Sequence, residues 1–260
     1  MKIVRFQDKQ VQKWGIIDGD IVRGITGSPF DRFAGPGGSY EFDGSASPLD
    51  QVQLLPPCLP SKIVCVGMNH WSMVTKEMTP HETPMIFLKP TTAVIATNES
   101  IAFPAAFNNV GFEGELAVVI GRAAKDVPKE KANEYILGYT CHNDVSDYDA
   151  IRGDGISMTR GKARDTFAPL GPCIVTEIDP GNLKLESFLN GKITQSGSTC
   201  DLIHDIPSLL SFISGIMTLL PGDVISTGTP KKSNDRLKNG DMIEIVIEGI
   251  GTLRNKVLQQ

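Results

Sequence analysis

The sequence predicts a β-rich α+β protein, a mixed β-roll or barrel-like sandwich with a small N-terminal domain that also contains strands. Two observations favour this class. The 260 residues include 26 Gly and 17 Pro, which is typical of a chain rich in strands and turns. Apolar, β-branched runs outnumber helical patterns and do not alternate regularly with them, which disfavours a doubly wound parallel sheet.

The first 55 residues are predicted to form the small domain and its linker, and residues 56–260 the large domain. Residues 14–23 have the pattern of a hairpin around Asp18-Gly19, since a short apolar run stands on each side of a turn signal. Residues 27–60 are rich in Gly, Ser and Pro, so we expect a connecting segment with room for one short helix.

The large domain is predicted to be mostly strands. Asn190-Gly191 marks a hairpin turn between two of them, and residues 242–248 alternate in polarity. Two helices are expected, at 128–137 and at 207–220; the second has apolar residues at helical spacing and Asp205 as its cap. Strands are expected at 62–66, 85–89, 111–121, 135–140, 172–176, 185–189, 193–195, 242–248 and 252–257.

Composition excludes several classes of protein. The net charge of −5 comes without a basic stripe, so nucleic acid is not expected as a partner. No apolar run approaches the ~20 residues that span a bilayer, and residues 1–8 lack the apolar core of a signal peptide. Five cysteines without a Cys-x-x-Cys pair indicate reduced thiols. We therefore expect a cytoplasmic protein that is not bound to a membrane.

Three carboxylates, Glu113, Glu115 and Asp144, are the strongest functional signal. Glu113 and Glu115 share one face of a predicted strand, and that face continues with Ala117 and Val119. By itself, Glu-x-Glu on a strand more often faces solvent. Carboxylates that enter an apolar surface, however, lose hydration and repel each other. This costs free energy unless a cation lies between them. Oxygen ligands without clustered Cys or His favour Mg²⁺ or Mn²⁺ over zinc or copper.

The chain resembles the fumarylacetoacetate hydrolase superfamily over about residues 61 to 257. Each matching motif is weak alone, but their number and order make the resemblance specific. The matching stretches are 66–69, 87–90, 112–121, 138–146, 161–167, 169–172, 221–230, 240–241 and 248–253. The resemblance implies the fold named above, and it implies Mg²⁺ or Mn²⁺ held by Glu113, Glu115 and Asp144.

The resemblance also implies residues that contact the substrate: Lys89, Lys162, Gln195 and Thr229, with Lys162 taking part in catalysis. Three of them have simpler explanations when taken alone. Lys89 can extend to water from a strand face, Lys162 can pair with Asp165 at the surface, and Thr229 can serve a Thr-Gly-Thr-Pro turn.

The sequence departs from the family where a water-activating base is usual. Met73 occupies the position of a His, and Met has no proton to transfer. His70 stands where Tyr is usual, and Glu77 lies one place beyond the usual Glu. His70 and Glu77 are candidates for a substitute base and its orienting partner, and His81 is another candidate.

The predicted function is metal-dependent enolate chemistry on a small 2-oxo or 1,3-diketo acid or diacid. The ion acts as a Lewis acid that stabilises the enolate, which serves isomerisation, tautomerisation or decarboxylation. A carbon–carbon hydrolase with a rebuilt base is the first alternative, and a non-catalytic metal-binding protein is the second. The resemblance further implies a homodimer.

Overall fold

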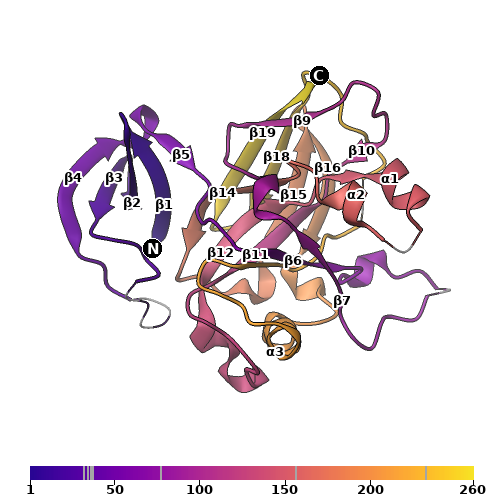
Figure 1. The fold of residues 1–260 in the computed structure, drawn as a ribbon, viewed down its shortest axis with the longest axis horizontal. Coiled ribbons are helices and arrows are strands. Elements are labelled where there is room, and N and C mark those ends of the chain that lie inside the picture. Colours follow the sequence, from indigo (N-terminus) through magenta and orange to yellow (C-terminus); the bar gives the residue numbers. More distant parts are fainter. Residues whose placement is uncertain (32, 34, 36–37, 77, 156, 232) are drawn as a thin grey trace.

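The computed structural model of the protein describes all residues except 32, 34, 36–37, 77, 156 and 232. It has a small N-terminal domain at one end, drawn in indigo and purple, and a larger domain beside it (Figure 1). The strands of the small domain are β1 (Lys2–Asp8), β2 (Val11–Asp18), β3 (Ile21–Ile25), β4 (Phe42–Pro48) and β5 (Gln53–Leu55). The predicted β-rich α+β class and the small N-terminal domain are confirmed.

The larger domain is built mainly of strands, with few helices. Its strands are β6 (Ile63–Gly67), β7 (Met85–Lys89), β8 (Val94–Ile95), β9 (Ser100–Phe103), β10 (Val110–Gly111), β11 (Gly114–Ile120), β12 (Ile136–Asn143), β13 (Ser146–Asp147), β14 (Ala168–Val175), β15 (Lys184–Leu189), β16 (Lys192–Ser198), β17 (Val224–Ser226), β18 (Met242–Ile247) and β19 (Gly251–Gln259). The α-helices are α1 (Tyr148–Gly153), α2 (Thr159–Lys162) and α3 (Ile206–Ile216). The 3₁₀ helices of the chain are η1 (Leu49–Gln51), η2 (Trp71–Met73), η3 (Thr91–Ala93), η4 (Lys129–Tyr135), η5 (Pro180–Asn182) and η6 (Thr199–Asp201).

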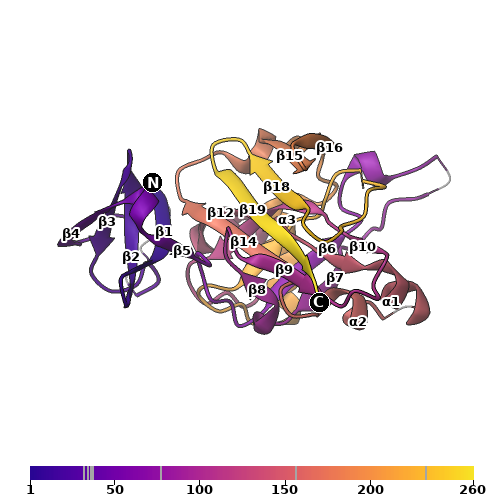
Figure 2. The same cartoon turned by 90° about the horizontal axis from the view of Figure 1, so that it is seen from above.

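One mixed sheet runs through both domains. Its strand order is β4-β3-β2-β1-β14-β12-β11-β17-β6-β7, and β1 joins the two parts because Lys2 and Ile3 pair with Val175 and Ile174 of β14. A second sheet, in the order β16-β15-β18-β19-β9, packs against the first. Seen from above, the small domain and the helix pair α1 and α2 lie at opposite ends of the molecule (Figure 2).

Strand β11 is buried on both faces. Alternate residues belong to two apolar clusters, with Leu116 and Val118 in one and Ala117 and Val119 in the other. Gly114 lies directly beneath the second sheet, since an added Cβ would come within 2.5 Å of Ser187 Oγ. Glu115 shares the face of Ala117 and Val119, as a period of two requires.

Several boundaries differ from the sequence prediction. The Gly- and Pro-rich segment of residues 27–60 contains β4 and β5 as well as the short helix η1. Helix α3 has the predicted cap, because Asp205 Oδ1 accepts a hydrogen bond from the Ser208 amide at 2.9 Å. It ends at Ile216 rather than near 220, since Leu219 instead exchanges backbone hydrogen bonds with Ala124. The helix expected at 128–137 is the 3₁₀ helix η4.

The hairpin predicted near the start of the chain is formed by β2 and β3. Asp18 pairs with Ile21, so the two turn residues are Gly19 and Asp20 rather than Asp18 and Gly19. Gly19 has a φ of +60°, which other residues rarely adopt. Among the described residues, no helix is long and apolar enough to cross a membrane.

Candidate metal centre

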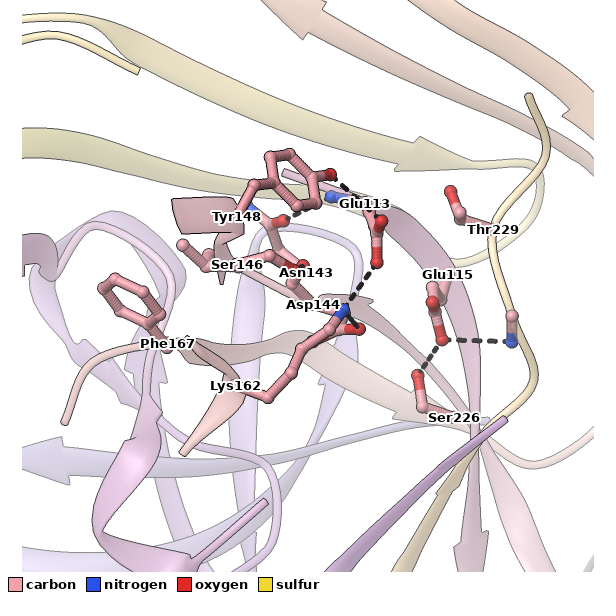
Figure 3. Close-up of polar contacts among 12 residues, drawn as sticks. Glu113, Glu115, Asn143, Asp144, Ser146, Tyr148, Lys162, Phe167, Ser226 and Thr229 are labelled. Carbon is pink, nitrogen blue, oxygen red and sulfur yellow. Dashed lines mark hydrogen bonds and ion pairs between the residues drawn. The ribbon is translucent and has the colours of Figure 1, made fainter. Parts of the chain in front are cut away.

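Glu113, Glu115 and Asp144 come together where two neighbouring strands meet. Glu113 immediately precedes β11, Glu115 lies within it, and Asp144 immediately follows β12. The antiparallel register pairs Gly114 with Asn143, and the Asp144 amide donates to the Glu113 carbonyl oxygen at 2.9 Å. One oxygen from each carboxylate lies within 4.8 Å of the other two (Figure 3). The shared strand face predicted that Glu113 and Glu115 lie together, and the family resemblance implied Asp144 as the third member.

The three carboxylates suit a hard divalent cation. All are almost fully buried, and their oxygen atoms are the ligands that Mg²⁺ and Mn²⁺ prefer. Burial, followed by the charges of Asp144 and Glu113, raises the pKa of Glu115 to about 8. The raised pKa reflects the free-energy cost of placing a third negative charge in a buried site, and a bound cation would offset that cost. The residues present therefore fit such an ion.

Lys162, the last residue of α2, faces the acidic cluster. Its Nζ lies 2.7 Å from Glu113 Oε2 and also forms an ion pair with Asp144 Oδ2 (Figure 3). Burial lowers the pKa of Lys162, but the two carboxylates outweigh burial and raise it above its usual value. A surface ion pair with Asp165, the simpler explanation offered for Lys162 from the sequence, does not fit, because only 4% of the Lys162 side chain is exposed.

Lys89, the last residue of β7, lies beneath Asp144. Its Nζ donates to the carbonyl oxygens of Val145, Lys162 and Phe167 at 2.7–2.9 Å and lies 2.8 Å from Asp144 Oδ1. Burial would raise the pKa of Asp144, but Lys162 and Lys89 lower it to about 2. The side chain is fully buried and does not line the cavity described below, so the structure does not place it against a substrate.

Gln195 and Thr229 hold the backbone between the two glutamates. Thr229 Oγ1 donates to the Gly114 carbonyl oxygen at 3.0 Å, while Gln195 Oε1 accepts from the Gly114 amide at 3.2 Å. Gln195 Nε2 also donates to Thr229 Oγ1 at 3.1 Å. Thr229 lines the cavity and Gln195 does not. Both therefore fix the Glu-Gly-Glu geometry, and Thr229 is the one within reach of a bound molecule.

The candidates for a substitute base are not gathered at the carboxylates. His70 is 1% exposed and does not line the cavity, and His81 is exposed, with its carbonyl oxygen bonded to His204. Glu77 lies outside the described residues. Met73, by contrast, lines the cavity.

Three residues at the site were not assigned roles from the sequence: Tyr148, Ser226 and His142. Tyr148, at the start of α1, donates its hydroxyl to Glu113 Oε1 at 3.0 Å. Ser226 donates to Glu115 Oε2 at 2.5 Å, and its Oγ lies 2.6 Å from Nδ1 of buried His142. Tyr148 lies two residues beyond the matching stretch that ends at residue 146, so the resemblance gave it no role. Ser226 was given none either, because its alignment with Glu115 depends on the pairing of β17 with β11.

Glu115 has a second fixed donor, the Gly228 amide at 3.0 Å. Gly228 has a φ of +101°, and a Cβ there would come within 3.0 Å of the Val66 carbonyl oxygen. Glycine is therefore needed where the backbone of residue 228 passes close to the Val66 carbonyl oxygen.

We predict that Ser226→Ala weakens Mn²⁺ binding about 10- to 100-fold, the usual effect of removing a group that orients a metal ligand. The hydroxyl and the Gly228 amide both donate to Glu115 Oε2, so loss of the hydroxyl leaves the amide alone to hold that oxygen and the carboxylate is oriented less firmly. Titration of Mn²⁺ by electron paramagnetic resonance measures the change. The matched control is Ser208→Ala at the start of α3, which should bind Mn²⁺ like the wild type. Wild-type affinity in Ser226→Ala would contradict the orienting role.

Buried His70 should make the stability of the protein depend on pH. Burial lowers its pKa from 6.5 to about 4, so the fold holds it neutral while the unfolded chain takes up a proton between these values. Its contribution to stability is complete above pH 6.5 and is lost as the pH falls toward 4. From about 1.4 kcal/mol per pKa unit, the wild type should lose about 3 kcal/mol more than His70→Gln over this range. Urea unfolding at pH 7 and pH 4 measures the difference, and an equal loss in both proteins would contradict it.

The carboxylates open into a cavity of about 150 Å³. Beyond the charged groups its wall is mostly apolar and contains four methionines, Met68, Met73, Met85 and Met158. A larger cavity of about 450 Å³ lies elsewhere, beside the start of β12 and the N-terminus of α3. The carboxylate cluster, the one group of at least three metal-ligating side chains found among the described residues, belongs to the smaller cavity.

Comparison with known proteins gives consistent matches. The model of the fumarylacetoacetate hydrolase C-terminal family matches residues 62–258, and that of the Rv2993c-like N-terminal family matches residues 1–57. Protein Rv2993c of Mycobacterium tuberculosis is 46% identical, covering 100% of this chain and 99% of its own. Human mitochondrial oxaloacetate tautomerase FAHD2A is 37% identical over 81% of this chain and 71% of its own.

Solved structures also match over the whole chain. 5-Carboxymethyl-2-hydroxymuconate delta-isomerase from Mycobacterium smegmatis has a TM-score of 0.91, with 44% identity and full coverage of both chains. Maleylpyruvate hydrolase from Sphingobium sp. SYK-6, in complex with manganese(II) and pyruvate, has a TM-score of 0.79 and 28% identity, covering 100% of this chain and 99% of its own.

Proposed function

Because the chain belongs to the fumarylacetoacetate hydrolase family, we propose that it is a divalent-metal-dependent enzyme that isomerises or tautomerises a small 2-oxo acid. The observation that carries the proposal is the wall of the carboxylate cavity. Met73 lies where a hydrolase of the family has its base, and among the described residues no histidine lines the cavity. The names of the relatives, a tautomerase and an isomerase among them, support the same choice.

Glu113, Glu115 and Asp144 would hold Mg²⁺ or Mn²⁺. A bound ion supplies Lewis acidity, which makes the carbon next to a chelated keto group more acidic. The manganese(II) and pyruvate in the maleylpyruvate hydrolase complex support this metal and ligand class. The neighbouring groups keep the three carboxylates in position: Tyr148 donates to Glu113, Ser226 donates to Glu115, and Lys89 pairs with Asp144.

Lys162 is the proposed catalytic residue. Among the described residues it is the one cationic side chain that lines the cavity, and its Nζ can donate a hydrogen bond to the oxygen that carries negative charge in the enolate form of a 2-oxo acid. The adjacent carboxylates favour the protonated amine, so Lys162 is suited to remain an ammonium that donates a hydrogen bond rather than to take a proton from the substrate. An apolar methionine wall offers a water molecule few hydrogen-bond partners near the reacting carbon, which disfavours hydrolysis of the substrate.

The proposed function is tested by incubating the Mg²⁺- or Mn²⁺-loaded protein with oxaloacetate, longer 2-oxo acids and acylpyruvates in D₂O. We expect faster keto–enol interconversion, seen by NMR as deuterium exchange at the carbon next to the keto group, without cleavage. Cleavage with incorporation of ¹⁸O from labelled water would establish the hydrolase alternative instead, and release of CO₂ would establish a decarboxylase. Metal binding without any turnover would favour the non-catalytic alternative.

The homodimer implied by the family resemblance remains a prediction. Light scattering at micromolar concentration tests it, and a particle of monomer mass throughout that range would contradict it.

A further inference from the structure

Buried His142 makes a hydrogen bond that the proposed function does not use. It belongs to β12, pairs directly with Glu115 of β11, and has no exposed surface. Its Nδ1 lies 2.6 Å from Ser226 Oγ on β17. Because β11 lies between β12 and β17 in the sheet, the two side chains meet across the strand that carries Glu115. His142 is therefore placed where it can act on that carboxylate through Ser226.

Ser226 makes two short contacts but has only one hydroxyl proton. Its Oγ lies 2.5 Å from Glu115 Oε2 (Figure 3) and 2.6 Å from His142 Nδ1. A carboxylate that binds a metal ion is ionised and can only accept a hydrogen bond. The hydroxyl proton therefore belongs to the contact with Glu115, and His142 must donate from Nδ1–H in the other contact. The hydrogen bonds run in one direction, from His142 through Ser226 to Glu115.

Ser226 is also what holds the His142 ring in place. The other ring nitrogen, Nε2, is buried and has no hydrogen-bond partner among the residues that the structure describes. Burying a polar ring costs free energy that hydrogen bonds must offset. In this part of the chain, the hydrogen bonding of the His142 ring is therefore directed entirely at Ser226.

The two donors to Glu115 Oε2 differ in how they are fixed. The Gly228 amide, at 3.0 Å, belongs to the backbone and cannot turn away. The Ser226 hydroxyl belongs to a side chain with three staggered positions, of which only one faces the carboxylate. A hydrogen bond from His142 stabilises that position, and successive hydrogen bonds polarise and strengthen one another in a buried site.

We propose that His142 is a positioning residue of the metal site, which holds the Ser226 hydroxyl toward Glu115 and so orients that carboxylate for the ion. The inference rests on the proposed function, which places Mg²⁺ or Mn²⁺ at Glu113, Glu115 and Asp144. Groups that orient metal ligands contribute to metal affinity without touching the metal.

The first test measures Mn²⁺ affinity by electron paramagnetic resonance. We expect His142→Leu to weaken binding about 10-fold, the lower end of the usual range for an orienting group. His142→Asn should recover most of the affinity, because its amide nitrogen is attached to Cγ as Nδ1 is and can donate to Ser226. In the Ser226→Ala protein, His142→Leu should cause no further loss, since the residue through which it acts is already gone.

Thr140→Val is the matched control. Thr140 pairs with Ala117 in the same ladder that pairs His142 with Glu115, so it shares the face of His142. It is also fully buried, and its Oγ1 has no hydrogen-bond partner among the described residues. Thr140→Val should therefore bind Mn²⁺ like the wild type. An equal loss in Thr140→Val and His142→Leu would show a general effect of changing this buried face, which would overturn the specific role of His142.

A second measurement needs no folded His142 variant to decide the direction of the hydrogen bond. Nitrogen-15 NMR of the Mg²⁺-loaded wild type, labelled at histidine, shows which ring nitrogen carries a proton. We expect a proton on Nδ1 of His142, whose signals are identified by a through-space contact to Ser226. An unprotonated Nδ1 would overturn the proposal whatever the variants show.

The outcomes also separate this inference from the proposed function. Wild-type Mn²⁺ affinity in a folded His142→Leu protein would overturn the positioning role, as would additive losses in the double variant. In both cases Mn²⁺ would still bind to the wild type, and the proposed function would stand. Failure of the wild type to bind Mn²⁺ would overturn both together.

Discussion

Glu115→Gln is expected to lose Mn²⁺ binding and nearly all activity while the metal-free protein remains folded. Loss of a group that only orients a metal ligand weakens metal binding about 10- to 100-fold. Removing the ligand itself should weaken Mn²⁺ binding by more than that. The raised pKa of Glu115 favours its neutral carboxyl at pH 7 when no metal is bound, so replacing it with the neutral Gln should leave the metal-free melting temperature near the wild-type value. In the wild type, Mn²⁺ should raise the melting temperature by mass action. In the variant, that rise should disappear.

The Asp144→Asn variant provides a contrast, because Asp144 is paired with both Lys89 and Lys162. It should lose metal binding and also be less stable than the wild type without metal. Glu244→Gln is the control, since Glu244 pairs with Arg254 on the exposed side of the second sheet. Wild-type Mn²⁺ affinity in either Glu115→Gln or Asp144→Asn would show that the ligands are assigned incorrectly.

Lys89→Met is expected to have the largest effect on stability. Removing one partner of a buried ion pair costs about 3–5 kcal/mol, because the other charge is left without compensation. Here Asp144 would lose a partner, and three carbonyl oxygens would lose their donor. For a chain of this length the melting temperature should fall by roughly 6–20 °C, in scanning calorimetry with or without Mn²⁺.

Lys125→Met serves as the control, since Lys125 is half exposed and pairs with its neighbour Asp126. A Lys89→Met protein with the wild-type melting temperature and a raised KM would contradict the structural role. That outcome would favour the substrate contact implied by the family resemblance.

The grouping of the three carboxylates was predictable because it depends on local patterns. The strand period places Glu113 and Glu115 on one face, and the apolar residues that follow show that this face enters the core. Asp144 follows a recognisable strand, and one antiparallel pairing brings it to Glu113. The principal helix and the hairpins also followed from local signals, the Asp205 cap among them.

The roles of Lys89, Tyr148 and Ser226 were not predictable from the sequence. Lys89 ends a short strand, and nothing near it indicates that Val145, Lys162 and Phe167 direct their carbonyl oxygens at its amine. Such contacts depend on the packing of segments far apart in the chain. Strand β4 was missed for a related reason: its residues have low strand propensity, and its pairing with β3 supplies the order.

The joining of the two domains through β1 has a consequence for the integrity of the protein. Strand β14 is apolar and pairs with β12 on one side, while Ile174 and Val175 are covered on the other side by β1. Removing the N-terminal strands would leave the backbone groups of these two residues as an open edge, which can recruit strands from other molecules. We therefore expect the small domain to shield this edge of the sheet from aggregation, and the large domain expressed alone would need another cover at that position.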